Sequence, residues 1–129
     1  PYTTLFRSGL AANDFGDSIR FGAATAAEDE KNLDLVHFDL SLYELYVKGY
    51  LEETKDVLTK EEIESLPWGA RLMTLECGIR FLTDYLQGDT YFKTDYPEHN
   101  LVRARTQFRL VDEMEQCFEK MREIVRKYA

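Results

Sequence analysis

One stretch constrains the fold more than any other, the segment from Ala70 to Gly88 (ARLMTLECGIRFLTDYLQG). Its aliphatic residues recur every three or four positions, which is the period of one helix face. They are Leu72, Leu75, Ile79, Leu82 and Leu86. Much of the remaining circumference is apolar too, and such a helix is normally buried among other helices. The segment therefore predicts a central helix that ends at Gly88.

Three charged residues interrupt this apolar segment at intervals of four: Glu76, Arg80 and Asp84. Burying an unpaired charge is costly, so these groups must pair with one another, with neighbouring residues or with a ligand. The pattern marks the central helix as the first place to look for a site.

Composition limits the classes of protein to consider. The 129 residues make one domain or part of one, and a hydrophobic content of 44% can build a sizeable core. A net charge of −8 argues against nucleic acid or an anionic membrane as the main partner, and the simplest interpretation is a solvated acidic surface. The two cysteines lie on apolar faces and are expected to be reduced core residues. No membrane span or secretory signal is visible, so we expect a cytoplasmic protein.

The first residues differ from the rest of the chain. Residues 1–8, PYTTLFRS, resemble the in-frame translation of a widely used sequencing adapter. We expect this segment to be non-native and residues 9–129 to be a natural helical part whose upstream portion is missing. The alternative is a genuine N-terminal strand.

The next segments contain weaker signals. Asn13 or Asp14 can cap a short helix, with Phe15 and Ile19 turned inward. Residues 33–40 alternate briefly and could form a short extended piece.

Two pairs have the form of a capping box, in which a hydroxyl residue is followed three positions later by Glu. Ser41 with Glu44 predicts a helix that runs to residue 54, and Thr59 with Glu62 predicts a short helix. Pro67 should end that short helix and begin the central one.

The C-terminal third is predicted to be a loop followed by one long helix. Residues 88–100 carry several aromatic side chains, and Asn100 can cap a helix that continues for about seven turns. Trp68, just before the central helix, is expected in the core. The predicted fold is an all-α antiparallel helix cluster.

Five blocks of sequence carry a resemblance to a known family. They are NDFGDSIRFG at 13–22, TAAEDE at 25–30, ECGIRFLTDY at 76–85, GDTYFK at 88–93 and HNLVRARTQFRLV at 99–111. In this order they resemble the C-terminal part of the N-acetylhexosamine 1-kinase branch of the aminoglycoside/choline phosphotransferase superfamily. The resemblance covers nearly everything from Leu10 onward and is more specific for the family than for the substrate.

The resemblance implies a protein-kinase-like fold in which ATP binds between two lobes and its γ-phosphate passes to a sugar hydroxyl. This chemistry needs a base Asp, and carboxylate and carboxamide ligands for Mg²⁺. In the family these groups lie upstream of the block at 13–22. We therefore expect ATP and Mg²⁺ to be cofactors of the complete protein, and this chain to hold no catalytic residue, no metal and no cofactor of its own.

Two short segments resemble the metal-binding motif and the catalytic loop that are expected upstream. The triplet Asp14-Phe15-Gly16 spells the metal-binding motif of protein kinases, but in the resembling family the metal-binding Asp precedes this block. Asp14 and Asp17 are therefore expected to cap the first helix and brace the catalytic loop. The segment 36–40 (VHFDL) echoes a catalytic loop, but it lacks the Gly and the later Asn, and it follows the first block.

The remaining candidate residues are those expected to contact the acceptor sugar. Arg80 matches the Arg of the family's Cys-Gly-x-Arg-Phe motif and Tyr91 the Tyr of Gly-Asp-x-Tyr-Phe. The resemblance implies that both bind sugar, since a guanidinium donates to sugar oxygens and a Tyr ring stacks on a pyranose. The alternative for Arg80 is a ladder with Glu76 and Asp84, and for Tyr91 packing within the loop. Asp84 is expected to orient Arg80.

Two further cations start the last helix. Arg103 and Arg105 could bind loop carboxylates such as that of Asp89, although bracing of the loop or a simple surface position is the preferred interpretation.

Two functions follow from these observations. The first is the acceptor-binding part of an ATP-dependent kinase for an N-acetylhexosamine or a related hydroxyl acceptor. Its partners would be the amino sugar and the missing N-terminal part of the same kinase. The alternative is a stand-alone helical interaction or oligomerisation module. A missing lobe should leave an exposed apolar side that includes Phe15, Ile19 and Phe21.

Overall fold

The protein is all-α. The computed structural model describes the backbone of residues 2–129 and the side chains from residue 11 onward. Its α-helices are α1 (Tyr2–Gly22), α2 (Leu40–Thr54), α3 (Lys60–Leu86), α4 (His99–Gln116) and α5 (Phe118–Tyr128), and a 3-10 helix, η1, spans Leu33–Leu35. No helix in this described part of the chain combines the length and apolar character needed to cross a membrane.

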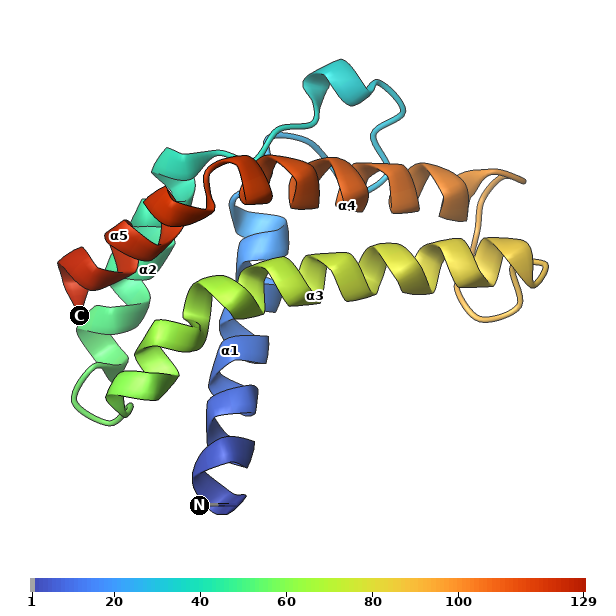
Figure 1. The fold of residues 1–129 in the computed structure, drawn as a ribbon. Coiled ribbons are helices and arrows are strands. Elements are labelled where there is room, and N and C mark those ends of the chain that lie inside the picture. Colours follow the sequence, from blue (N-terminus) through green and yellow to red (C-terminus); the bar gives the residue numbers. More distant parts are fainter. Residues whose placement is uncertain (1) are drawn as a thin grey trace.

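The long helices α3 and α4 lie side by side and antiparallel, and α1 crosses α3 at a steep angle (Figure 1). Near the N-terminal end of α3, α2 and α5 pack together. The core fills the space between these elements. Its largest fully buried apolar side chains are Phe15, Ile19, Tyr43, Leu51, Leu66, Met114 and Met121.

The first helix is longer than the sequence indicates. Because α1 begins at Tyr2, the expected cap at Asn13 or Asp14 is wrong, and both residues lie inside the helix. The alternative of an N-terminal strand is also wrong, since residues 2–8 belong to α1. Pro1 lies outside the described residues.

The expected exposed side is only partly present. Phe15 and Ile19 are buried at 2% and 1% exposure, because they pack into the core between α1 and α2, and only Phe21 is exposed. The extended piece expected at 33–40 is reduced to η1 and an isolated bridge between Ala24 and Phe38.

Helix α2 begins at Leu40, and its N-cap is Asp39 and not Ser41. The Asp39 carboxylate accepts hydrogen bonds from the N–H groups of Ser41 and Leu42, which are donors that the helix itself leaves free. Asp39 is therefore a helix cap, and this agrees with the rejection of residues 36–40 as a catalytic loop.

Helix α3 is continuous from Lys60 to Leu86, so the expected break at Pro67 is wrong. The capping box of Thr59 and Glu62 is confirmed, with both reciprocal hydrogen bonds present. A proline inside a helix cannot donate to the carbonyl four residues earlier, which favours a bend, and α3 changes direction in its first part in Figure 1.

The predicted buried face of α3 is also wrong. Leu72, Ile79 and Leu86 are 58%, 49% and 74% exposed, and Trp68 is 47% exposed. Smaller residues face the core, where Ala70, Thr74 and Gly78 accompany Leu66 and Phe81. The cause is the close approach of the neighbouring helices: a Cβ at Gly69 would lie 2.2 Å from the carbonyl oxygen of Ala12, and one at Gly78 would lie 2.6 Å from the Phe108 ring.

The predicted last helix is divided at Cys117 into α4 and α5. The break turns α5 toward α2, where the Tyr43 hydroxyl donates to the carbonyl of Met121 at 3.1 Å and Lys127 pairs with Glu44 at 2.8 Å. The expected cap is also wrong, since α4 begins before Asn100, whose side chain turns inward.

Candidate functional site

A groove of about 590 Å³ lies between α1, α3, the loop after α3 and the start of α4. Its apolar lining includes Met73, Phe81 and Phe92. Its charged lining residues are Asp14, Asp17, Arg20, Glu28, Arg80, Lys93 and Arg103. The lining therefore combines hydrogen-bond donors, hydrogen-bond acceptors and aromatic rings. A second hollow, of about 490 Å³ between α3 and α5, is lined by none of the candidate site residues predicted from the sequence.

Arg20 is the most buried cation of the groove, at 8% exposure. Its guanidinium contacts the carboxylate of Glu28 and lies 3.3 Å from Asp17 Oδ1 and 3.4 Å from Gln107 Oε1. Burial acts to lower the pKa of Arg20, but the hydrogen bond to Glu28 and the nearby carboxylates outweigh it and raise the pKa. This network joins α1, the acidic segment 25–30 and α4 on one side of the groove.

Asp14 and Asp17 lie on the exposed side of α1 and both line the groove. Their predicted role as helix caps is wrong, because the helix begins far upstream of them. Asp17 is half exposed and pairs with Arg20, whereas Asp14 contributes an exposed carboxylate.

Asp84 does not line the groove itself, but it holds the loop that carries Phe92 and Lys93 to it. It is 4% exposed, and its carboxylate accepts hydrogen bonds from the N–H groups of Tyr91 at 2.8 Å and Phe92 at 3.0 Å. The Asn100 amide donates to the same carboxylate at 2.7 Å. Burial would raise the pKa of Asp84, but the N–H groups of Phe92 and Tyr91 and the amide of Asn100 hold it below its usual value. The prediction that Asp84 orients Arg80 is therefore wrong, since the loop occupies this carboxylate.

The turn after α3 brings the loop back to Asp84. Gly88 has a φ of 96° and Asp89 a φ of 60°, which confirms Gly88 as the residue that ends the helix. The N–H of Asp89 donates to the carbonyl of Asp84 at 2.8 Å, and the Asp89 carboxylate accepts from Asn100 at 3.0 Å. Loop, α3 and α4 are thereby tied together at one point.

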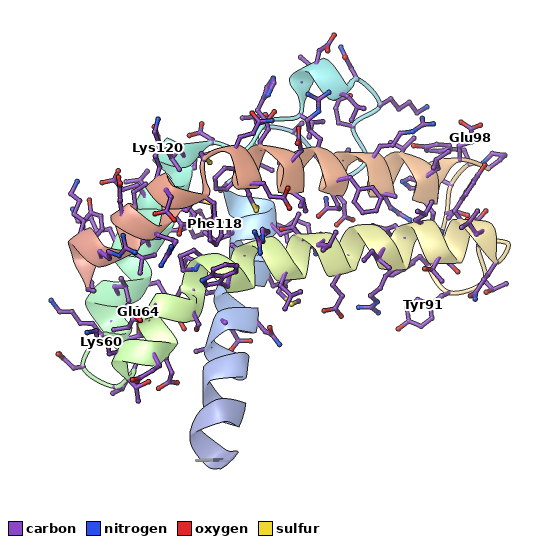
Figure 2. All side chains as sticks on the ribbon, viewed as in Figure 1. Lys60, Glu64, Tyr91, Glu98, Phe118 and Lys120 are labelled. Atoms are coloured by element: carbon purple, nitrogen blue, oxygen red, sulfur yellow. The ribbon has the colours of Figure 1, made fainter. Side chains whose placement is uncertain are left out.

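Arg80 and Tyr91 lie on the outer side of this arrangement. The guanidinium carbon of Arg80 is 5.8 Å from the Tyr91 ring centroid and 5.7 Å from the Phe92 ring centroid. Tyr91 is 73% exposed, and Figure 2 shows its side chain projecting away from the end of α3. Arg80 lines both the groove and a shallow hollow of about 330 Å³ that includes Tyr91. The structure thus brings the two predicted residues together, and it leaves both accessible.

Arg103 braces the loop, as the preferred interpretation had it. Its guanidinium donates to the carbonyl of Lys93 at 3.0 Å and to Asn100 Oδ1 at 3.1 Å, and it lies 5.6 Å from the Phe81 ring centroid. Arg105 is exposed on α4 and does not line the groove.

Sequence reasoning missed a buried histidine beside the site. His99 is 2% exposed, and its Nδ1 accepts a hydrogen bond from the N–H of Asp95 at 3.1 Å. The other ring nitrogen therefore carries the proton and donates to Asp29 Oδ2 at 3.0 Å. This hydrogen bond lowers the pKa of Asp29. Only the position of His99 between a loop and a helix start could have indicated its role.

The arrangement suits a polar, hydroxylated ligand better than a metal ion. Within residues 11–129, no group of three or more His, Cys, Asp and Glu side chains could hold a metal. The groove instead offers guanidinium donors, carboxylate acceptors and aromatic rings, which can hydrogen-bond to and stack on a polar ligand. In a comparison with models of known protein families, the chain matches none of them.

Proposed function

We propose that this chain is the acceptor-binding helical part of an ATP-dependent sugar kinase that phosphorylates an N-acetylhexosamine. In this proposal it corresponds to the C-terminal helical subdomain of a protein-kinase-like phosphotransferase. One observation carries the proposal: all five sequence blocks that resemble the kinase family contribute to the same groove. The block at 13–22 contributes Asp14, Asp17 and Arg20, and the block at 25–30 contributes Glu28. The block at 76–85 contributes Arg80 and Phe81, the block at 88–93 contributes Phe92 and Lys93, and the block at 99–111 contributes Arg103.

Arg80 and Tyr91 are the proposed sugar-binding residues. A guanidinium presents several N–H donors in a fixed plane, and an exposed Tyr ring offers both an apolar face and a hydroxyl. Asp84 and Asn100 hold the backbone beneath Tyr91, so they position the binding residues without touching the ligand. Asp14 and Asp17 add acceptors on the opposite wall of the groove.

ATP and Mg²⁺ belong, in this proposal, to the upstream part of the kinase. The described side chains do not fit a Mg²⁺ site. The isolated chain is therefore expected to bind the acceptor without phosphorylating it. Phosphate transfer by this chain alone, with ATP and Mg²⁺, would contradict the placement of the catalytic groups upstream.

Binding of free sugar to the purified chain tests the proposal. Saturation-transfer NMR with an N-acetylhexosamine should show contact through the sugar protons. Arg80→Ala should weaken binding about tenfold, because a hydrogen bond to a charged group contributes about 1.5 kcal/mol or more. Arg80→Lys should restore little of this loss, since an ammonium group lacks the planar set of donors.

Arg105→Ala is the matched control, because it removes an exposed arginine of α4 that does not line the groove. Equal binding by the wild-type chain and Arg80→Ala would contradict the assignment of Arg80. A panel of other amino sugars, an aminoglycoside and a small alcohol tests the acceptor class. Preferential binding of one of these compounds would refute the proposal that the acceptor is an N-acetylhexosamine.

A further inference from the structure

The outward face of α3 carries an apolar row that the fold leaves exposed. We call it the outer stripe and define it as Trp68, Leu72, Leu75, Ile79, Leu82 and Leu86. Four of these residues are between 47% and 74% exposed, and Leu75 and Leu82 are partly exposed. Single exposed apolar residues are ordinary, but a continuous row along about five helical turns marks a contact surface.

The spacing of the outer stripe fits the a and d positions of a heptad. Successive members are separated by four, three, four, three and four positions, so every second member recurs after seven positions. Such a row keeps apolar residues on one side of the helix, where a second helix can pack along it. In heptad terms Leu72, Ile79 and Leu86 occupy a positions, and Leu75 and Leu82 occupy d positions.

The exposure of the stripe agrees with this pattern. Helices α1, α4 and α5 all pack against α3, and Trp68 contacts Phe118 of α5 with ring centroids 4.7 Å apart, but Leu72, Ile79 and Leu86 stay exposed. The groove and the outer stripe therefore use different faces of α3, and a partner on the stripe leaves the groove open.

We propose that the outer stripe is the interface of a symmetric homodimer in which the α3 helices of two copies pack parallel and in register. The charges beside the stripe argue for this occupant and this orientation. Arg71 is at a g position and Glu76 at the following e position, five residues later. In a parallel pair the g residue of one helix meets the next e residue of the other, so two Arg71–Glu76 pairs form by symmetry.

The residue types favour the same arrangement. A β-branched residue at a combined with Leu at d favours two parallel strands, and Ile79 lies between Leu75 and Leu82 in this way. An antiparallel pair would also align apolar residues, but it would place the two copies of Glu76 beside each other.

The size of the stripe sets the expected strength. Its apolar area is on the order of a few hundred Å² per copy, below the roughly 800 Å² per partner of a standard stable interface. The dimer should therefore be weak and in equilibrium with monomer at the concentrations of a typical sedimentation experiment.

Analytical ultracentrifugation over a wide range of protein concentration tests association. The wild-type chain should show a monomer–dimer equilibrium, and Ile79→Lys or Leu86→Lys should weaken it about tenfold or more. Leu45→Lys is the matched control, because Leu45 is a 64% exposed leucine on α2, away from the stripe. A chain that stays monomeric throughout, or an equilibrium that the stripe variants leave unchanged, would overturn the proposal.

Leu86→Cys tests the orientation under mild oxidation. In the parallel dimer the two introduced thiols meet and form a disulfide, whereas an antiparallel pair separates them by about 27 Å along the helix axis. The wild-type chain, with Cys77 and Cys117, gives the baseline. Dimers that Leu86→Cys fails to link would overturn the parallel arrangement.

The charge pair provides an independent test of register. Arg71→Glu and Glu76→Arg should each weaken association, and the double variant should restore it. Failure of the double variant to recover association would refute the predicted Arg71–Glu76 contact.

Discussion

Asn100 is the residue whose replacement tests the architecture of the candidate site most directly. It is fully buried, and its amide donates to the carboxylates of Asp84 and Asp89 while its oxygen accepts from Arg103. Asn100→Ala removes both donations. A hydrogen bond to a charged partner contributes about 1.5 to 3 kcal/mol, so the free energy of unfolding should fall by about 3 kcal/mol.

Thermal unfolding followed by circular dichroism measures this loss. For a chain of this length about 1 kcal/mol corresponds to roughly 4 °C, so the midpoint should fall by about 12 °C. Asn13→Ala is the control, since Asn13 is exposed on α1, and its replacement should change the stability by less than about 1 kcal/mol. A fall of less than about 4 °C in Asn100→Ala would refute the reasoning.

Hydrogen exchange separates local loosening from global destabilisation. The N–H groups of Tyr91 and Phe92 donate to Asp84, whose carboxylate loses one of its partners in Asn100→Ala. These two amides should exchange faster than amides in the core, where only global unfolding permits exchange. Unchanged exchange in the loop would show that Asn100 does not hold it.

Two further predictions concern packing and pH. Gly69→Ala should destabilise the chain by about 2 kcal/mol, because the new Cβ meets the Ala12 backbone at 2.2 Å, whereas Gly49→Ala, with nothing within 4 Å, should stabilise it by about 0.5 kcal/mol in the same denaturant titration. The hydrogen bond to Glu113 raises the pKa of His37 above 6.5, so the stability from this pair is present below pH 6.5 and is lost as the pH rises through the folded-state pKa. His37→Gln should flatten that part of the stability–pH curve, and an unaltered curve would contradict the assignment.

Local signals in the sequence predicted local structure well. The capping box at Thr59 and the helix end at Gly88 depend on residues within three or four positions of each other, and both are confirmed. The boundaries that failed had competing signals. Asp39 displaces Ser41 as the cap of α2 through an equally local contact, since its carboxylate accepts from the N–H groups of Ser41 and Leu42. Helix α3 continues through Pro67, although a proline there cannot donate a hydrogen bond within the helix.

The candidate site could be predicted only in part, because some of its contacts depend on turns of the chain that the sequence pattern does not reveal. Spacing of four placed Asp84 next to Arg80, but the carboxylate turns instead toward the amides of Tyr91 and Phe92. That contact depends on the turn at Gly88, which reverses the loop. The pairing of Arg20 with Glu28 was likewise invisible, since the bend that brings α1 onto the acidic segment has no short sequence signal.

The error about the buried face of α3 has a physical cause that also accounts for the groove and the exposed stripe. A helix that is apolar around much of its circumference has no face that hydrophobicity alone can select, so the side that packs inward is decided by fit. Gly16 and Gly69 let α1 and α3 approach until a Cβ at Gly16 would lie 2.3 Å from the Gly69 carbonyl oxygen, and only the small side of α3 allows this. The larger residues are then directed outward by default. The close crossing of α1 and α3 thus accounts both for the groove and for the exposed stripe. Gly69→Ala, which forces the two helices apart, should disturb the groove while leaving the stripe residues exposed.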